Sequence, residues 1–417
     1  MHRDGRFEKS MDPDAAKYSA SLKEDLRIFK AVVQINKAHV KMLKKEKIID
    51  EKDADQILNA LSKLEKKTPS ELDLRPELED IHMVVEEYVK NETGEETGGK
   101  LHTAKSRNDQ VATAVRMVLK KDILKIEELI LETIEELKKL ADKNVDTIMP
   151  GYTHLQVAEP TTFAHYLLSY IQTLFRDLER LEEAYKQTDQ CPLGACAFAG
   201  TSFPINRKTT SELLGFREVM RNTMDAVSSR DFALQTMSAL SILMTNLSRF
   251  SEEIILWGSA EFDMIEIPDE FSSTSSIMPQ KKNPVIPELE RAKCGRIVGN
   301  LTGGLNIMKN LPQAYNLGLQ ELTPLLWDSI DQAKSTLNVM KKLIAKLEPK
   351  PKNMQRNAKE GFPTATELAN IIVKQTDTPF RKAHQIVGQL SAIASEKNKS
   401  TQDLTIEDLR EASKKIL

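Results

Sequence analysis

One feature constrains this chain more than any other: after Val115, apolar residues keep helical spacing for almost thirty residues. They recur at Val118, Leu119, Ile123, Ile126, Leu129, Ile130, Ile134, Leu137 and Leu140. A helix of that length spans roughly 40 Å at 1.5 Å per residue. Helices this long with wide apolar faces cannot bury those faces within one thin monomer. The pattern therefore predicts a helical bundle that other subunits complete.

Similar spacing elsewhere predicts an all-α protein with three helical regions. Residues 1–110 form an N-terminal domain of shorter helices, one of which is expected to open at Pro76. Residues 111–350 form the central bundle, and residues 351–417 a small C-terminal helical domain. The long helices of the bundle are expected to start near residue 115, Pro160, residue 226, Pro287 and residue 323. No run of residues favours a strand.

Composition excludes several classes of protein. Lys and Arg together number 59 against 62 for Asp and Glu, and aromatic residues make up 5%, so nothing favours a nucleic-acid partner. Three cysteines without paired spacing, Cys191, Cys196 and Cys294, indicate neither disulfides nor a zinc site and fit a reducing, cytoplasmic setting. No apolar run is long enough for a membrane span, and the N-terminus does not resemble a signal peptide.

A polar stretch at residues 272–284 interrupts the helical pattern. It contains five consecutive hydroxyl residues, followed by Pro279, Lys281, Lys282, Asn283 and Pro284. Proline lacks the amide hydrogen and fixes φ, so we expect a loop here and a new helix at Pro287. Hydroxyl, amide and ammonium groups beside a helix N-terminus can bind a carboxylate or stabilise an oxyanion. A solvated serine–lysine linker is the alternative interpretation.

Two other polar segments stand out, at residues 100–110 and 150–156. Loops at the ends of long antiparallel helices can converge, either within one chain or across subunits. The three segments offer histidine, hydroxyl, guanidinium, amide and ammonium groups, but no metal-ligand spacing and no cofactor fingerprint. Such a set suits removal of a proton next to a carboxylate, because the resulting dianionic aci-carboxylate needs preorganised donors and cations.

The same segments resemble a known enzyme family. SSIMPQKKNP resembles the signature of the fumarase and aspartase superfamily, and KLHTAKSRNDQVAT and PGYTHLQ resemble its argininosuccinate lyase branch. EDIH, DAVSSRDF and AYNLGLQE agree, so the resemblance covers nearly the whole chain. It implies an all-helical homotetramer with a central twenty-helix core and active sites shared between subunits. It also implies reversible cleavage of argininosuccinate to arginine and fumarate in arginine biosynthesis, without metal or organic cofactor.

Position by position, the resemblance assigns roles to individual residues. The catalytic positions are Ser275, His154, Lys281, Asn283 and Glu288. Ser275 and His154 match the proton-transfer pair, and which of them removes the proton stays open. Lys281 and Asn283 match groups that bind the substrate carboxylate, and Glu288 matches the carboxylate that holds the histidine. The substrate-binding positions are Ser21, His82, Arg107, Asn108, Thr153, Arg230, Tyr315 and Gln320.

Several of these residues also have plainer interpretations. Glu288 suits the first turn of a helix simply because the helix dipole favours an acid there. His82 is as consistent with buried hydrogen bonding as with substrate contact. We expect His165, on the apolar side of its helix, to be a packed core residue, and Lys282 to be a solvated neighbour of Lys281.

The chain also departs from the family pattern. Thr274 stands where the signature usually has glycine, Lys105 where arginine is more common, and Thr323 where many members have a substrate-contacting lysine. The sequence ends at Leu417, sooner than the resemblance leads us to expect. Two alternatives stay open: another fumarate-releasing lyase of the superfamily, such as adenylosuccinate lyase, or a catalytically silent helical scaffold.

Overall fold

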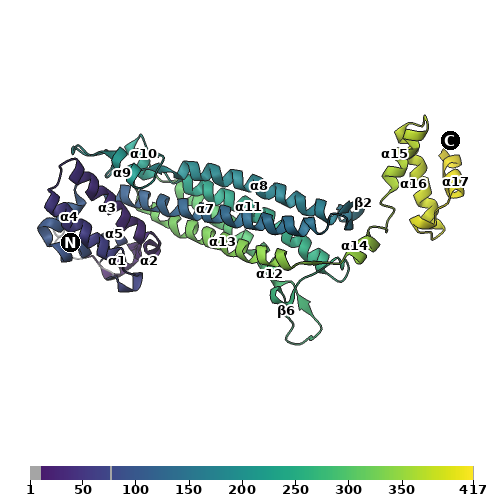
Figure 1. Cartoon of the computed structure of the whole chain (residues 1–417), viewed down its shortest axis with the longest axis horizontal. Coiled ribbons are helices and arrows are strands. Elements are labelled where there is room, and N and C mark those ends of the chain that lie inside the picture. The colour runs from purple at the N-terminus through teal and green to yellow at the C-terminus, as the bar shows by residue number, and fades with distance from the viewer. Residues whose placement is uncertain (1–10, 76–77, 417) are drawn as a thin grey trace. The chain divides into compact units, whose positions relative to one another are not determined.

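The protein is mostly helical, and the computed structural model describes residues 11–75 and 78–416 (Figure 1). Its five long helices are α7 (Arg107–Asp142), α8 (Phe163–Thr188), α11 (Asp231–Gly258), α12 (Val285–Met308) and α13 (Leu322–Lys346). The apolar stripe that defines α7 in the sequence is buried, as Leu119, Ile123 and Ile130 show. The predicted all-α fold class is confirmed.

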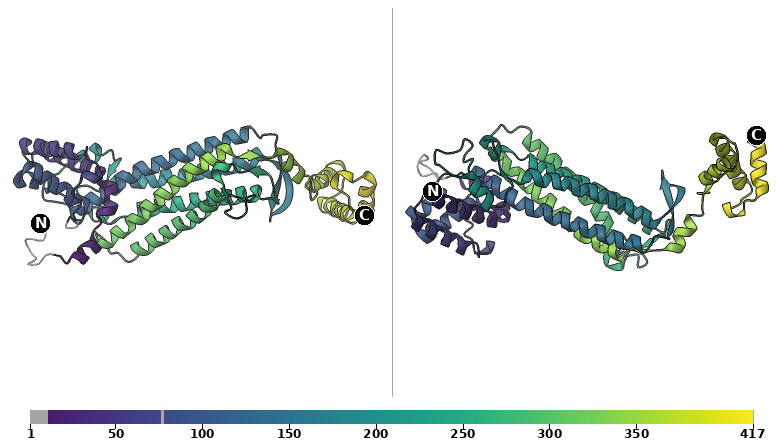
Figure 2. Two further views of the ribbon diagram at one scale, coloured as in Figure 1. Left: turned by 90° about the horizontal axis from the view of Figure 1, so that it is seen from below. Right: turned by 45° about the horizontal axis from the view of Figure 1, so that its top comes forward.

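The chain forms two compact units. The first comprises residues 1–128, 177–242 and 295–334, and the second comprises residues 129–176, 243–294 and 335–417. Each long helix contributes one segment to each unit, and within a unit these segments lie side by side (Figure 2). The division at residues 110 and 350 that the sequence suggests stays a prediction.

The first unit also contains the short N-terminal helices. They are α1 (Pro13–Ser19), α2 (Leu22–Asp25), α3 (Phe29–Lys45), α4 (Glu51–Leu64), α5 (Ile81–Thr93) and α6 (Glu95–Gly99), joined by α9 (Arg207–Leu213), α10 (Thr223–Ser228) and the parallel strands β3 (Gln190–Cys191) and β4 (Glu218–Val219). Asp80 starts α5 by accepting a hydrogen bond from the Met83 amide at 2.9 Å. Pro76, the expected start of this helix, lies outside the described residues.

Glycines on α12 allow close helix packing at one point. A Cβ atom at Gly304 would lie 2.8 Å from Leu322 and 3.0 Å from Leu234, so no larger residue fits between α12, α13 and α11 without a shift. Gly295 and Gly299 have no such neighbour within 4 Å in the chain. The glycine pattern of α12 is therefore explained by packing within the chain only at its C-terminal end.

The second unit adds three short two-stranded sheets and the C-terminal helices. The strands are β1 (Ile148–Thr153) with β2 (Gln156–Thr162), β5 (Ile265–Glu266) with β8 (Glu348–Pro349), and β6 (Ser273–Thr274) with β7 (Lys282–Asn283), all antiparallel. The helices are α14 (Pro351–Asn357), α15 (Ala365–Gln375), α16 (Phe380–Glu396) and α17 (Ile406–Ile416). Across the two units, 3-10 turns occur at Leu26–Ile28, Pro69–Glu71, Lys100–His102, Asp269–Phe271, Leu317–Glu321 and Thr401–Asp403.

The hairpin β1–β2 corrects the expectation that no strand occurs and that a helix starts at Pro160. Pro160 pairs with Pro150 across the hairpin, and α8 starts three residues later at Phe163. A bulge between Pro150 and Tyr152 interrupts the alternation of the strand, which hides it in the sequence. The hairpin also packs against the unit, with the Tyr152 ring 5.5 Å from that of Phe262.

Two further expectations change. Residues 272–284 are not wholly a loop, because Thr274 pairs with Lys282 in the hairpin β6–β7. The φ angle of Thr274 is not positive, so this position does not need the conformational freedom of glycine, and a β-branched residue fits the strand. His165 is exposed rather than packed, and its Nδ1 lies 2.8 Å from the Thr161 hydroxyl. In the described residues, no helix is long and apolar enough to cross a membrane.

Candidate active site

A cavity of about 670 Å³ opens in the first unit. Six of the eight candidate substrate-binding residues line it: Ser21, His82, Arg107, Arg230, Tyr315 and Gln320. These residues are spread over three hundred positions of sequence, so it is the packing of the first unit that brings them around one space. Thr323, at the position where many family members have lysine, lines the cavity as well.

Ser21 reaches the cavity just before α2, where two hydrogen bonds hold it. Its hydroxyl donates to Asp25 Oδ2 at 2.7 Å, and its amide donates to the Glu79 carbonyl at 3.1 Å. Asp25, which the sequence analysis missed, lines the cavity too. Burial raises the pKa of Asp25 to about 6, although the hydrogen bond from Ser21 opposes the shift. The available signal was its position four residues after a candidate serine.

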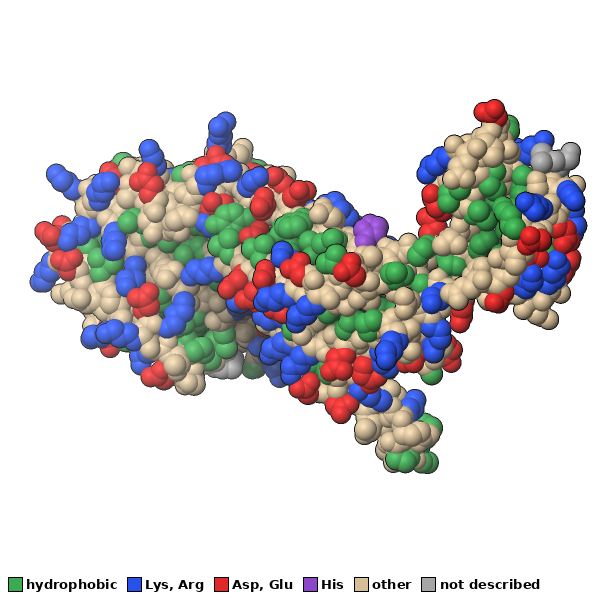
Figure 3. Space-filling view, turned by 45° about the vertical axis from the view of Figure 1, so that its right-hand side comes forward, with side chains coloured by type: hydrophobic (Ala, Val, Ile, Leu, Met, Phe, Trp, Pro, Cys, Tyr) green, Lys and Arg blue, Asp and Glu red, His purple; other side chains and the backbone are tan. Residues whose placement is uncertain are grey.

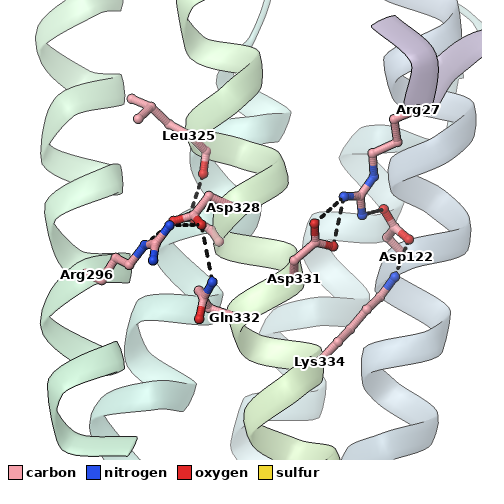
Figure 4. Close-up of polar contacts among 9 residues, drawn as sticks. Arg27, Asp122, Arg296, Leu325, Asp328, Asp331, Gln332 and Lys334 are labelled. Atoms are coloured by element: carbon pink, nitrogen blue, oxygen red, sulfur yellow. Dashed lines mark hydrogen bonds and ion pairs between the residues drawn. The ribbon is translucent and has the colours of Figure 1, made fainter. Parts of the chain in front are cut away.

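Arg27 anchors this segment to the long helices (Figure 4). Its Nη1 donates to both carboxylate oxygens of Asp331 at 2.8 Å, and its Nη2 donates to Asp122 at 2.7 Å. Asp122 also pairs with Lys334, and the Arg27 guanidinium lies 4.7 Å from the centre of the Trp327 ring. Because a two-oxygen contact fixes orientation as well as distance, the wall that carries Ser21 is held in one place.

Arg107, the first residue of α7, is paired with an acid at the cavity wall. Its Nη1 donates to Asp80 Oδ2 at 2.8 Å, with Glu79 further away at 3.6 Å. Burial by itself would raise the pKa of Asp80, but His82, the Met83 amide and Arg107 together lower it. Asp80 therefore stays ionised, and this acid was also missed in the sequence analysis.

His82 is buried beside both acids and bases. Neither of its ring nitrogens has a hydrogen-bond partner among the described residues. Burial lowers the pKa of His82 to about 4 against the attraction of Asp80, so the ring is neutral near pH 7. A neutral imidazole can donate from one nitrogen and accept at the other, which leaves His82 ready to bind a polar ligand.

Arg230 brings a second guanidinium to the cavity from the corner between α10 and α11. It is 4% exposed, and its Nη1 donates to the carbonyls of Ser229 at 2.9 Å and Val227 at 3.3 Å. Burial lowers the pKa of Arg230 to about 10, so the group is still cationic at neutral pH.

Burial also raises the pKa of Tyr315, which keeps that phenol protonated. Gln320 donates from Nε2 to the Ser19 carbonyl at 3.1 Å.

A second cavity of about 400 Å³ shares His82 and Arg107 with the first. Asn108 lines it, and its side chain donates to the Ala197 carbonyl at 3.0 Å. Lys105 is also part of its wall, is buried and donates to the side chain of Asn36. Burial lowers the pKa of Lys105 to about 7, so its charge changes near neutral pH.

His154 lies in the second unit at the tip of the hairpin β1–β2. The two-residue turn between Thr153 and Gln156 consists of His154 and Leu155, with φ of 55° and 57°. Positive φ at both positions is the geometry of a type I′ hairpin turn, in which residues other than glycine and asparagine are strained. The turn therefore presents the His154 ring on an exposed tip. Thr153, a candidate for substrate contact, ends β1 beside it.

Ser275 follows β6 in the other hairpin of this unit. Its hydroxyl oxygen accepts hydrogen bonds from the amides of Ile277 at 3.3 Å and Met278 at 3.0 Å. The Ser275 amide donates to the Lys281 carbonyl at 3.4 Å, which closes the loop. Two amide donors aimed at one oxygen favour its negatively charged form, so the loop geometry suits an alkoxide at Ser275.

The remaining catalytic candidates are near this loop in the chain. Lys282 forms ion pairs with Glu266 and Asp269, as expected for a neighbour in solvent, while Lys281 is exposed and makes no ion pair with any described residue. Asn283 is half-buried in β7, and Glu288 is exposed in the first turns of α12.

The structure does not bring all the candidates together. None of the five catalytic candidates lines either cavity. Within the described chain, no hydrogen bond joins Glu288 to His154, so the expectation that one holds the other stays a prediction. In residues 11–75 and 78–416, no group of three or more His, Cys, Asp or Glu side chains is placed to hold a metal ion.

Known sequences resemble the chain over nearly its whole length. Residues 5–299 match a family described as lyase, and residues 362–417 match one described as argininosuccinate lyase C-terminal. An argininosuccinate lyase of Methanothermobacter thermautotrophicus is 47% identical over 414 residues, which cover 99% of this chain and 88% of that protein. One from Desulforamulus reducens is 44% identical over 410 residues, which cover 98% and 89%.

Solved structures show the same fold. The crystal structure of EDDS lyase in complex with formate has a TM-score of 0.87 and 31% identity, and the match covers 94% of this chain and 77% of that one. The class II fumarase from Schistosoma mansoni has a TM-score of 0.78 at 18% identity, covering 94% and 87%. The second likeness concerns the fold alone.

Proposed function

Because the chain belongs to the argininosuccinate lyase family, we propose that it is a carbon–nitrogen lyase that cleaves argininosuccinate reversibly to arginine and fumarate. The observation that carries this proposal is the cavity of the first unit. It combines the guanidinium groups of Arg107 and Arg230 with the carboxyl groups of Asp25 and Asp80. Argininosuccinate has both carboxylates and cationic groups, so a wall of mixed charge suits it.

The reaction removes a proton from the carbon next to one carboxylate of the succinate part. The electron pair is held in an aci-carboxylate, and its return forms the double bond of fumarate as the bond from the neighbouring carbon to nitrogen breaks. Lys281 and Asn283 supply the cation and the amide that stabilise the aci-carboxylate. We assign the proton removal to Ser275, because the amides of Ile277 and Met278 already point at its oxygen.

His154 then provides the proton for the departing arginine nitrogen. Its exposed place on a hairpin tip allows it to approach a ligand bound elsewhere. An acid at this step is needed because an unprotonated guanidine nitrogen is a poor leaving group. In the reverse direction His154 accepts the same proton, and Ser275 returns its proton to carbon.

The active site is completed by other copies of the chain, in a cytoplasmic homotetramer. The cavity holds the substrate-binding residues but none of the five catalytic candidates. Apolar side chains also lie at the surface among charged ones (Figure 3). On the described long helices, the large apolar residues that are at least 39% exposed are Leu124, Leu131, Leu168, Phe175, Ile242, Leu289, Val298 and Leu305. Exposed apolar residues repeated along helices of this length suit burial against further helices.

A fumarate assay on the wild-type protein tests the activity. We expect fumarate release from argininosuccinate, with the same rate after treatment with a chelator. Preference for adenylosuccinate would favour the other lyase of the superfamily. Release of fumarate from neither substrate would contradict both lyase activities and favour the interpretation as a catalytically silent helical scaffold.

A mixing experiment tests the sharing of sites. At a low argininosuccinate concentration, the Ser275→Ala chain lacks the base and the Arg230→Met chain binds substrate weakly, so each is expected to be nearly inactive alone. When they are denatured and refolded together, mixed tetramers contain some sites with a wild-type Ser275 from one copy and a wild-type Arg230 from another. Activity should reappear in the mixture, and a mixture no more active than its components would contradict sharing.

A further inference from the structure

Arg116 is a buried cation whose role the reaction does not explain. It lies on α7, is 1% exposed, and forms no ion pair with any described residue. Its Nη1 donates to the Gln187 carbonyl at 2.7 Å, and its Nη2 donates to the Ser229 hydroxyl at 3.0 Å. The guanidinium carbon is 3.8 Å from the centre of the Phe232 ring. Arg116 thus joins the end of α8 to the corner between α10 and α11.

Stability alone is a poor reason for this arrangement. Burial, with the charge of Arg230 adding to it, lowers the pKa of Arg116 to about 9, so the group stays charged at neutral pH. Its Nε has no hydrogen-bond partner among the described residues. Asp231 and Asp225 attract the charge but form no ion pair with it. Burying a charge without an ion pair is costly, and an apolar side chain of similar volume would fill the space at lower cost.

The corner that Arg116 holds also carries Arg230. Ser229 contacts both groups, because its hydroxyl accepts from Arg116 while its carbonyl accepts from Arg230 at 2.9 Å. The other described contact of the Arg230 guanidinium is the Val227 carbonyl, which belongs to the same corner. Arg230 therefore has no hydrogen bond to any other element in the described chain, and its position depends on where the corner sits.

We propose that Arg116 is a positioning residue which, through Ser229, holds the Arg230 guanidinium at the wall of the substrate cavity. The proposal rests on the proposed function, in which Arg230 binds substrate. Without Arg116 the corner keeps its local hydrogen bonds but loses its link to α7 and α8. Substrate binding should then suffer more than the chemical step, because the reacting groups lie elsewhere in the sequence.

The test is a double-mutant cycle on the full-length chain, with fumarate release measured over a range of argininosuccinate concentrations. Arg116→Met should raise KM about tenfold while kcat stays within about threefold, as expected for the loss of one charge-assisted contact. Arg116→Lys should cause a smaller rise, since an ammonium can keep one of the bonds. The double variant Arg116→Met with Arg230→Met should have the KM of Arg230→Met alone, because the two residues act through one contact.

Lys120 provides a matched control. It lies one turn further along α7, is buried, contacts Asp189 and the Gly215 carbonyl, and is 4.7 Å from the centre of the Phe216 ring. Its contacts do not lead to a residue that lines the cavity. Lys120→Met should lower the thermal unfolding temperature at least as much as Arg116→Met and leave KM unchanged.

Several outcomes would overturn the proposal. An unchanged KM in Arg116→Met, or KM effects that multiply in the double variant, would show that Arg116 does not act through Arg230. An equal rise of KM in Lys120→Met would show a general effect of lost stability. If Arg116→Met does not fold, the same cycle with Arg116→Lys decides. A wild-type protein that releases no fumarate from argininosuccinate would instead overturn the proposed function, and this inference with it.

Discussion

The cavity of the first unit and the hairpins of the second unit hold their functional groups in opposite ways. In the cavity, Arg107 and Ser21 are bonded to buried acids, so their positions are set before any ligand arrives. In the hairpins, His154 is exposed, and the hydrogen bonds of Ser275 in the described chain stay within its own loop. The comparison fits the proposed function, in which the groups of the cavity are prepared for binding while the groups of the hairpins stay free to close on the substrate.

Ser275→Ala tests the hairpin side and should have the largest effect. Removing the base should lower kcat by about 10³-fold or more, which corresponds to about 4 kcal/mol of activation free energy. KM and the thermal unfolding temperature should change little, because the hydroxyl is bonded only within its loop. The neighbouring exposed Ser276→Ala is the control. A Ser275→Ala variant that keeps a tenth of the wild-type kcat would show that Ser275 is not the base of the reaction.

Glu290→Gln sharpens the comparison by testing a buried carboxyl of the second unit that forms no ion pair with any described residue. Glu290 is 3% exposed, and burial raises its pKa to about 7, which the nearby Ser251 hydroxyl only partly offsets. The protonated form is the stable one, so wild-type stability should fall as the pH rises from 4.5 to 7. The difference between these pKa values corresponds to about 3 kcal/mol.

Urea denaturation at several pH values measures this effect. The Gln variant should unfold like the wild type at pH 4.5 and be more stable than the wild type at pH 8. The effect of Asp80 on stability has the opposite dependence on pH, because its pKa is lowered in the folded protein. Its contribution to the unfolding free energy is present above pH 3.8 and lost in acid. Equal stability of Glu290→Gln and wild type across the range would show that this carboxyl is not buried in the folded protein.

Arg107→Met tests the cavity side by removing the cation next to Asp80. The carboxylate, whose side chain is 4% exposed, would be left without its ion pair, so we expect a loss of about 2 kcal/mol of unfolding free energy and a higher KM. Arg296→Met is a control in the same unit, because its pair with Asp328 is more exposed and should contribute less than about 1 kcal/mol. Equal losses of unfolding free energy in both variants would contradict the idea that the pair of Arg107 with buried Asp80 holds the cavity wall in place before a ligand binds.

Leu155→Gly should have the smallest effect, on the hairpin that carries His154. Leu155 is 67% exposed with φ of 57°, so glycine should relieve strain and stabilise the chain by up to about 1 kcal/mol. Leu155→Ala keeps the Cβ atom and should bring no such gain. A lower urea midpoint for the glycine variant would show that the leucine side chain, not the backbone, shapes this tip.

The helices were predictable from the sequence where the apolar period extends over many residues. They were less predictable where the chain turns between two helices. The helix expected to start near residue 323 begins at Leu322 and ends at Lys346. By contrast, the helix expected from residue 226 breaks between Ser228 and Asp231, which creates the corner that carries Arg230. An apolar stripe continues through such a break, so the period alone does not reveal it.

The candidate site was predictable through its motifs but not through its charges. Motif matching pointed to six residues that the fold gathers around one cavity, since short polar segments of this kind stand out from a helical background. It missed Asp25 and Asp80, because an acid near the start of a helix is common and only burial makes these two unusual. The strands were missed because the strands of three of the four pairs are only two residues long, and because a bulge interrupts the alternation of β1.

The sequence by itself determined the long helices, the polar segments between them and the chemical groups that these segments offer. Those features depend on local periodicity and residue type, which are complete in the sequence. Only the tertiary structure decided which groups meet: Arg27 with Asp331, Arg116 with Ser229, and Arg107 with Asp80. Such pairings depend on distance and burial, and a helical pattern shows which face is buried but not what covers it.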